Sequence, residues 1–204
     1  MIVIIDYGIG NGGSILNMLD KIGAKAKMSS GLYDIEGADK LILSGVGAFD
    51  SCVRKLSDMN LIPLLNRKVL EDKAPILGVC LGMQVMTKRS EEGNLPGIGW
   101  FEARTVKFKF DDPGENMRIP HIGWNTIQIK RNNVLFEGLD HNCRFYFMHS
   151  YHVVCDRQDD VLAETFYGRE FNSVINKDNI FGVQFHPEKS HKFGMKILRN
   201  FANL

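Results

Sequence analysis

Short apolar runs alternate with amphipathic segments over the first 90 residues of the chain. Continuous apolar runs are typical of strands buried on both faces of a parallel sheet, whereas apolar residues spaced three or four apart predict helices. The pattern predicts strands at 2–5, 24–28, 40–43 and 75–79, and helices at 15–22, 61–70 and 81–88. This alternation indicates an α/β fold, with a mostly parallel central sheet flanked by helices.

The second half of the chain has a different pattern, in which apolar and polar residues alternate. Period-two alternation is typical of antiparallel strands with one covered face. Strands are expected at 105–110, 126–129, 144–147, 161–165, 173–175 and 181–184. A final amphipathic helix is expected around Phe193 to Phe201. No repeat, low-complexity run or linker interrupts the chain, so we expect residues 1–204 to form a single domain with an added antiparallel β portion.

Composition narrows the class of protein. Of the 204 residues, 44% are hydrophobic and 24% are charged, which is typical of a globular chain and excludes disordered and collagen-like proteins. The 25 Lys and Arg residues nearly balance the 24 Asp and Glu residues, which argues against a nucleic-acid partner. The apolar start, 2–5, is too short for a signal peptide, and the apolar window 75–86 is too short to span a bilayer. We therefore expect a cytoplasmic protein with no membrane segment.

Cys80 is the candidate nucleophile. It lies at the centre of Gly78-Val79-Cys80-Leu81-Gly82, where an expected strand meets an expected helix, and this is the layout of a nucleophile elbow. A cysteine taken at random is more often a buried structural residue. The elbow favours a reactive thiolate instead, because a helix N-terminus lowers the pKa of a thiol placed there. The four cysteines form no C-x-x-C pair, so neither a disulfide framework nor a zinc site is expected.

His186 and Glu188 are the candidate general base and its orienting group. A thiol nucleophile needs both, and they need only meet it in space. His186 follows the expected strand at 181–184 and should therefore emerge at a sheet edge, where open α/β sheets place their sites. An isolated histidine is more often structural, but the strand-end position and the acidic neighbour favour a catalytic role.

The chain also offers donors for a developing oxyanion. In an elbow, one donor is the backbone N–H of the residue after the nucleophile, here Leu81, and the other comes from the loop after the third strand. That loop is residues 44–47, Ser-Gly-Val-Gly, which we call the oxyanion loop. Gly45 and Gly47 flank Val46 and let the backbone turn its N–H groups toward a substrate. A plain strand-to-helix turn is the alternative interpretation.

Two other patterns point to different chemistry. Residues 8–13 contain G-x-G-x-x-G between a strand and a helix, as in dinucleotide-binding proteins, but residues 28–30, where the ribose-binding acid is expected, are Met, Ser and Ser. His149 and His152 resemble a metal-binding pair, yet in an extended strand residues three apart point to opposite faces. No further ligand completes the pair. We therefore expect neither a metal site nor a cofactor.

Six blocks of sequence, taken together, resemble the class I glutamine amidotransferases. Their triad consists of a cysteine in G-x-C-x-G and a His-x-Glu near the C-terminus. Within this family the chain is similar to the glutaminase subunits of imidazole glycerol phosphate synthases, and the similarity covers essentially its whole length. The blocks are 5–11, 44–49, 78–84, 120–125, 147–151 and 185–190.

The resemblance implies a flavodoxin-like α/β amidotransferase fold and a triad of Cys80, His186 and Glu188. Cys80 would attack the side-chain amide of glutamine, and His186 would protonate the departing ammonia. The γ-glutamyl thioester left on the sulfur would then be hydrolysed by water to glutamate. By the same similarity, the oxyanion loop and Leu81 would surround the oxyanion, and Gln84 would help to hold glutamine.

Released ammonia needs an acceptor, and this chain has neither room for an acceptor domain nor a P-loop. We therefore expect its partner to be a separate synthase subunit. The resemblance implies that the partner is a (β/α)8 barrel, the cyclase subunit, which conducts ammonia through its interior to a phosphoribosyl intermediate. The complex would make imidazole glycerol phosphate and AICAR in histidine biosynthesis. The positions that match the family's docking face are Asn11, Pro120, Trp124, Asn125, Tyr146 and Lys189.

Departures from the family pattern leave alternatives open. The family usually has Pro in place of Ser44 and a larger apolar residue near Gly12, and the residues 189–194 are larger than usual. Paralogous subunits supply ammonia to a sugar-modifying amidotransferase in surface-polysaccharide biosynthesis, which is the alternative pathway. Two other classes are a thiol hydrolase acting alone on another amide or ester, and a binding protein that is catalytically silent or uses residues 8–13 for a dinucleotide.

Overall fold

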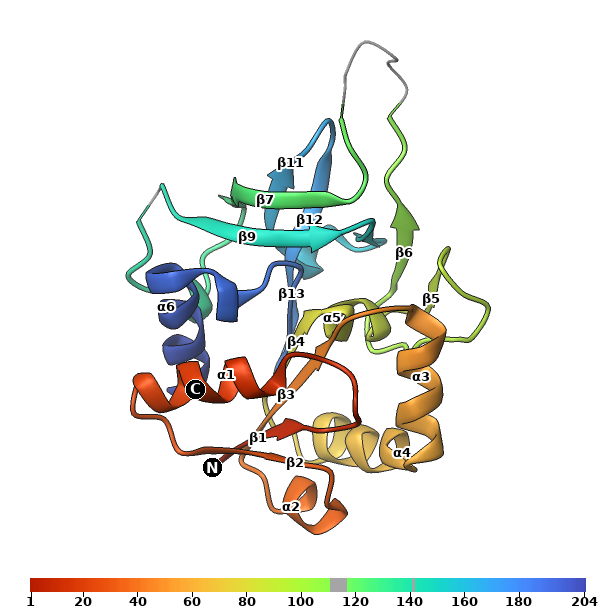
Figure 1. Ribbon diagram of the computed structural model, residues 1–204, viewed down its shortest axis with the longest axis vertical. Helices are drawn as coiled ribbons and strands as arrows, with labels where there is room; N and C mark the ends of the chain where they lie inside the picture. The colour runs from red at the N-terminus through yellow and green to blue at the C-terminus, as the bar shows by residue number, and fades with distance from the viewer. Residues whose placement is uncertain (111–116, 141) are drawn as a thin grey trace.

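Parallel strands form the first half of the central sheet. The computed structural model describes residues 1–110, 117–140 and 142–204. The parallel strands are β1 (Ile2–Ile5), β2 (Ala26–Ser29), β3 (Lys40–Gly45), β4 (Ile76–Cys80) and β13 (Ile180–Val183). They lie in the order β2-β1-β3-β4-β13 (Figure 1). This order brings β4 and β13, which lie about a hundred positions apart in sequence, next to each other at the centre of the sheet.

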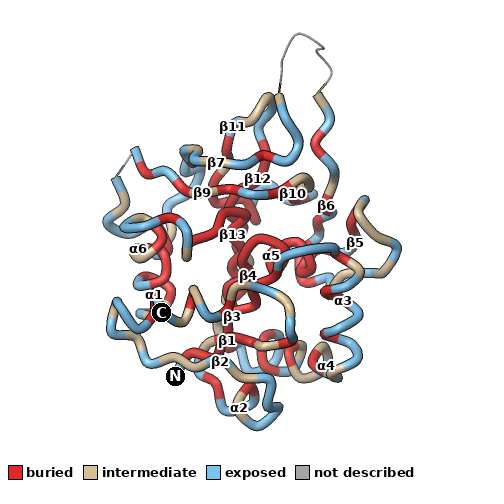
Figure 2. The backbone as a smooth tube through the Cα atoms, viewed as in Figure 1, coloured by how far each residue is buried: buried red, intermediate tan, exposed pale blue. Residues whose placement is uncertain are grey.

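Helices cover both faces of the parallel strands. They are α1 (Gly12–Lys21), α2 (Leu32–Glu36), α3 (Phe49–Asp58), α4 (Leu61–Asn66), the π-helix η1 (Arg67–Glu71) that continues it, α5 (Leu81–Val85) and α6 (His191–Ala202). Apolar side chains of α1 and α6 pack in one buried cluster, and those of α2 to α5 pack in another on the opposite face. Of the strands between them, β1, β4 and β13 are buried along their length, whereas the edge strand β2 is partly exposed (Figure 2). In the described part of the chain, no helix is long and apolar enough to cross a membrane.

A mostly antiparallel extension continues the sheet beyond β13. It contains β12 (Glu170–Lys177), β10 (Tyr151–Cys155), β6 (Ala103–Lys107), β5 (Arg89–Ser90), which pairs with β6 in parallel, β11 (Val161–Phe166) and β8 (Gln128–Ile129). A separate antiparallel pair, β7 (His121–Thr126) and β9 (Arg144–His149), lies over this part of the molecule (Figure 1). Short 3-10 turns are η2 (Val134–Phe136), η3 (Gln158–Asp160) and η4 (Pro187–Lys189). The predicted α/β class with a mostly parallel sheet and an added antiparallel portion is confirmed.

The structure differs locally from the sequence pattern at three places. The expected strand at 126–129 is divided, because β7 pairs with β9 while β8 pairs with β11, and the buried Ile127 lies between them. The helix expected at 81–88 ends at Val85. Helix α3, absent from our expectation, carries buried apolar residues spaced three and four apart, so its signal was present in the sequence.

Candidate active site

Cys80 lies at the carboxyl end of β4 in a strained turn. Its backbone has φ 54° and ψ −111°, a conformation that is rarely adopted by residues other than glycine. The flanking glycines are required by close packing. A Cβ on Gly82 would lie 1.8 Å from the Leu43 carbonyl oxygen, and one on Gly78 would lie 2.8 Å from the Met83 nitrogen. The predicted elbow geometry is therefore present, although the helix that follows is only five residues long.

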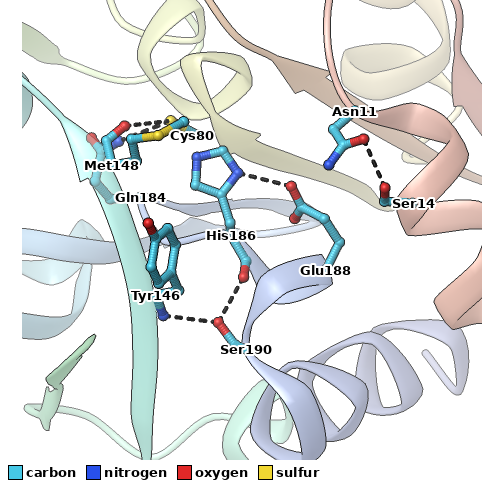
Figure 3. Close-up of polar contacts among 9 residues, drawn as sticks. All are labelled: Asn11, Ser14, Cys80, Tyr146, Met148, Gln184, His186, Glu188 and Ser190. Carbon is cyan, nitrogen blue, oxygen red and sulfur yellow. Dashed lines mark hydrogen bonds and ion pairs between the residues drawn. The ribbon is translucent and has the colours of Figure 1, made fainter. Parts of the chain in front are cut away.

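His186 reaches the same sheet edge from the next strand. Because β13 runs parallel to β4, with Val183 opposite Val79, the two chains leave the sheet side by side. The imidazole is 1% exposed, and its Nδ1 lies 2.8 Å from the Glu188 Oε1. Figure 3 shows the ring between Cys80 and Glu188. Since a carboxylate only accepts, Nδ1 carries the proton of that bond.

The other ring nitrogen of His186 is directed toward the sulfur. This Nε2 is buried and has no hydrogen-bond partner among the described residues. Burial opposes protonation of the ring, but interaction with the Cys80 sulfur and the hydrogen bond to Glu188 outweigh it and raise the pKa of His186 to about 10. His186 therefore holds a proton at neutral pH, which it can deliver to a leaving amine.

Two further groups contact the Cys80 sulfur. The Gln184 Nε2 donates to Sγ at 3.6 Å, and the sulfur lies 3.9 Å from the Met148 carbonyl oxygen (Figure 3). Gln184 is fully buried and directly follows β13, two residues before His186. Sequence reasoning missed Gln184, although its place at the end of the expected strand at 181–184 was a usable signal.

A cavity of about 220 Å³ opens beside the sulfur. This is smaller than the roughly 300 to 1,000 Å³ typical of drug-sized ligand sites, and it suits an amino-acid-sized molecule. The lining residues include Val46, Gly47, Cys80, Leu81, Gln84, Glu92, Pro120, Met148, His149, Ser150, Tyr151 and His186. Four of the residues predicted for the oxyanion and substrate site thus line the cavity that contains the thiol.

Gln84 is held rigidly at the back of this cavity. Its Nε2 donates to the Tyr151 carbonyl oxygen at 2.9 Å and to the Gln184 Oε1 at 3.0 Å. Both amide protons are therefore used within the protein, and only the side-chain oxygen is left for a ligand.

The oxyanion loop is fixed at one end and open at the other. The buried Tyr7 hydroxyl donates to the Ser44 carbonyl oxygen at 2.7 Å and accepts from the Cys52 thiol at 3.2 Å. Gly45 has no room for a side chain, because a Cβ there would lie 2.7 Å from the Tyr7 hydroxyl. Gly47, in contrast, has φ +100° and open space around it, so only glycine's backbone freedom explains it.

Residues predicted for the docking face form an aromatic and cationic surface on β7, β9 and η4. Trp124, 42% exposed, stacks on His191 at 5.4 Å, and the Lys189 ammonium lies 5.6 Å from the Tyr146 ring centroid. The Asn125 Nδ2 donates to the Phe166 carbonyl oxygen at 2.9 Å.

The remaining docking positions lie on either side of the cavity. Pro120 belongs to its rim, and Asn11 caps α1 and accepts from the Ser14 hydroxyl at 2.7 Å. Figure 3 shows the Asn11 amide on the Glu188 side of the triad.

Packing explains two of the glycines in residues 8–13. A Cβ on Gly10 would lie 2.8 Å from the Ser44 carbonyl oxygen, and one on Gly12 would lie 2.7 Å from the Met28 sulfur. These two glycines let the loop and α1 approach β3 and β2, whereas a Cβ on Gly13, the last glycine of the G-x-G-x-x-G pattern, would meet nothing within 4 Å.

The histidine pair differs from our expectation. His149 and His152 do not diverge to opposite faces, because the chain turns at Ser150 between β9 and β10. Both imidazoles pack on Phe108, with ring centroids 5.3 and 4.6 Å away. Among the described residues, no group of three or more His, Cys, Asp or Glu side chains is arranged to hold a metal ion.

The family model and the relatives that match this chain indicate the same family. The family model described as "Glutamine amidotransferase class-I" matches residues 3–204. A Methanococcus maripaludis protein named "Imidazole glycerol phosphate synthase subunit HisH 2" is 52% identical, over 98% of each chain. A Pseudomonas aeruginosa protein of the same name is 47% identical over the full length of both chains.

Solved structures agree with the fold. A putative GMP synthase subunit from Thermoplasma acidophilum has a TM-score of 0.73 at 21% identity, covering 99% of this chain and 92% of its own. The structure of PurLQS from Thermotoga maritima also has a TM-score of 0.73, at 16% identity, covering 99% and 97%. At these identities the likeness concerns the fold alone.

Proposed function

The chain belongs to the class I glutamine amidotransferase family, and from this premise we propose that it is the glutaminase subunit of an imidazole glycerol phosphate synthase in histidine biosynthesis. It hydrolyses glutamine to glutamate and supplies the ammonia to a synthase subunit. The observation that carries the proposal is the alignment of Cys80, His186 and Glu188 at one sheet edge, beside a cavity of amino-acid size. Full-length relatives at 42–52% identity bear the corresponding name.

The proposed reaction uses these three side chains in sequence. The Cys80 sulfur attacks the side-chain carbonyl carbon of glutamine, forming a C–S bond while the C=O electrons move onto oxygen. As the tetrahedral intermediate collapses, the C–N bond breaks and His186 delivers its proton to the leaving ammonia. His186 then takes a proton from water, which attacks the thioester and releases glutamate. Glu188 keeps the proton on Nδ1, so that Nε2 performs both transfers.

The oxyanion formed in each step needs donors next to the sulfur. The Leu81 N–H, at the start of α5, is one, and a backbone N–H of the oxyanion loop is the other. The hydrogen bond between Tyr7 and Ser44 supports this role, because it fixes the strand that leads into the loop. Gln84, with its free side-chain oxygen facing the cavity, is proposed to hold the amino-acid end of glutamine.

We assign the partner as the (β/α)8-barrel cyclase subunit, and the cytoplasm as the location of the complex. The proposed docking surface comprises Asn11, Pro120, Trp124, Asn125, Tyr146 and Lys189. Its character supports this use, since aromatic rings such as the exposed Trp124 are enriched in protein interfaces. Ammonia released at the buried sulfur is then delivered next to the partner rather than to bulk water.

Glutamate release from glutamine tests the proposal. We would measure it for this chain alone, with a barrel synthase subunit, and with that subunit plus its phosphoribosyl ligand, using Cys80→Ala as the blank. Ligand-dependent stimulation is expected. Hydrolysis that ignores the barrel would retain the glutaminase but reject the histidine pathway in favour of a sugar-modifying partner. No hydrolysis under any condition would overturn the enzyme assignment.

A further inference from the structure

Two buried histidines outside the triad lie between the docking surface and the cavity. His121 on β7 is 3% exposed and His149 at the end of β9 is 6% exposed. Their facing nitrogens, His121 Nδ1 and His149 Nε2, are 3.2 Å apart. The proposed reaction uses neither ring, yet His149 lines the cavity that contains Cys80.

The partners of these rings fix where each proton lies. His149 Nδ1 is 2.8 Å from the Tyr151 carbonyl oxygen, which only accepts, so Nδ1 is protonated. Burial lowers the pKa of both imidazoles, so each ring is neutral and has one bare nitrogen. His149 Nε2 therefore accepts from His121 Nδ1, and His121 Nε2 accepts from the Asn125 Nδ2 at 3.4 Å. The bonds run in one direction, from Asn125 to Tyr151.

The chain of bonds ends on an oxygen that also belongs to the cavity wall. The Tyr151 carbonyl accepts from His149 at 2.8 Å and from Gln84 Nε2 at 2.9 Å, which occupies both of its lone pairs. Gln84 in turn donates to Gln184, and Gln184 donates to the Cys80 sulfur. Each hydrogen bond in this series uses a different N–H proton.

We propose that Asn125, His121 and His149 are positioning residues for glutamine hydrolysis, which hold the Tyr151 carbonyl and, through it, Gln84 and Gln184 in place against Cys80. We call these three residues the histidine chain. The inference rests on the proposed function, because it names residues that shape the glutamine site. Removing His149 leaves the Tyr151 carbonyl with one donor, and removing His121 takes away the donor that fixes the tautomer and orientation of the His149 ring. Either change lets the cavity wall move, so the main effect is on glutamine binding.

The test uses substitutions that keep ring size or keep one donor. His121→Phe and His149→Phe remove the chain's donors but retain a ring that packs in the aromatic cluster. His149→Asn retains an N–H close to the position of Nδ1. His152→Phe is the matched control, because His152 is a buried imidazole packed on the same Phe108, with its Nδ1 near the Val153 carbonyl oxygen and outside the chain.

Steady-state glutamine hydrolysis with the barrel subunit gives the readout. We expect KM for glutamine to rise about tenfold in His121→Phe and His149→Phe, to stay within about threefold of wild type in His149→Asn, and to be unchanged in His152→Phe. A purely structural role would lower kcat through loss of folded protein and leave KM unchanged. Equal KM values in all variants, or an equal rise in the control, would overturn the inference.

A substrate-free measurement separates this inference from the proposed function. If the wild-type protein does not hydrolyse glutamine, the proposed function fails, and the rate of Cys80 alkylation by iodoacetamide then decides about the histidine chain. A change of at least about threefold in the alkylation rate of His121→Phe and His149→Phe, but not of His152→Phe, supports the positioning role of the histidine chain. Identical alkylation rates in all of them reject it.

Discussion

The parallel strands and the antiparallel extension contribute to one cavity by different means. The parallel strands supply the proposed nucleophile, its base and the oxyanion loop, and close packing of the backbone imposes these positions, as at Gly82 against Leu43. The antiparallel strands supply the opposite wall, with His149 from the β7–β9 pair and Tyr151 from the extension. The proposed reacting groups are therefore fixed by backbone packing, whereas the wall depends on hydrogen bonds made by side chains.

Removing the nucleophile gives the largest expected effect on the parallel side. Cys80→Ala should lower glutamine hydrolysis by at least about 10⁴-fold, since no other group forms the thioester. The fold should be retained because the side chain shrinks by one atom in a site that faces the cavity. Activity with the barrel subunit and thermal melting are the measurements. Retained turnover would contradict the assignment of the nucleophile.

Backbone packing at the elbow is tested by adding one methyl group. Gly82→Ala should destabilise the protein by about 3 kcal/mol, because the new Cβ overlaps the Leu43 carbonyl oxygen. Gly13→Ala is the control, since a Cβ there meets nothing within 4 Å. Urea unfolding of the two variants should give opposite signs, with Gly13→Ala neutral or slightly stabilising. Similar stabilities would mean that the elbow is not held by this contact.

The triad should make the stability of the protein fall as the pH rises into the alkaline range. The pKa of His186 is raised to about 10 from an unfolded value near 6.5, so its contribution is complete below about pH 6.5 and is lost as pH rises toward 10. Glu188→Gln should flatten this decline, because the variant removes one of the groups that raise the pKa. Urea unfolding between pH 6 and 10 measures it. An unchanged slope would mean that Glu188 does not stabilise the imidazolium.

Two buried histidines of the antiparallel strands should affect stability on the acid side: His152 on β10 of the extension and His121 on β7 of the separate pair. Burial lowers the pKa of His121 and His152 to about 4, so their contribution is present above about pH 6.5 and is lost as pH falls through 4. His152→Phe removes a group that must remain neutral, and it should reduce the loss of stability between pH 6.5 and 4. If the acid limb is the same in the variant, His152 is not the group that titrates.

The smallest effect is expected where the oxyanion loop is anchored. Tyr7→Phe deletes one hydroxyl and leaves the Ser44 carbonyl oxygen without that donor. We expect a loss of about 1 kcal/mol in stability and a fall of a few fold in kcat, with KM little changed. Cys52→Ala, which removes only the donor behind the hydroxyl, is the control and should retain kcat. A rise in KM with kcat unchanged would argue against an effect on the loop.

The parallel strands and the candidate triad could be predicted from sequence because their signals are local. A buried run ending in Gly78 to Gly82 and a histidine at a strand end can be recognised within a few residues. The contacts of Tyr7 with Ser44 and of Gln184 with Cys80 join positions 37 and 104 residues apart, so no local pattern reveals them.

The turn at Ser150 shows a second reason why the sequence pattern did not predict part of the site. It divides what the pattern presents as one strand and thereby brings His149 and His152 to the same cluster, against the period-two rule. The tautomer of His149 likewise depends on the Tyr151 carbonyl oxygen, and that of His121 depends on His149, and these groups meet only after the chain has folded. Such tertiary effects override the local pattern.

The neighbouring placement of β4 and β13 has a consequence for the protein's synthesis on the ribosome. The ribosome makes the proposed nucleophile about a hundred residues before it makes the proposed base and β13, the strand that pairs with β4. Pairing at such a sequence separation is slow and comes late in folding. A nascent chain that has not yet reached β13 therefore holds the Cys80 thiol without the groups proposed to activate it.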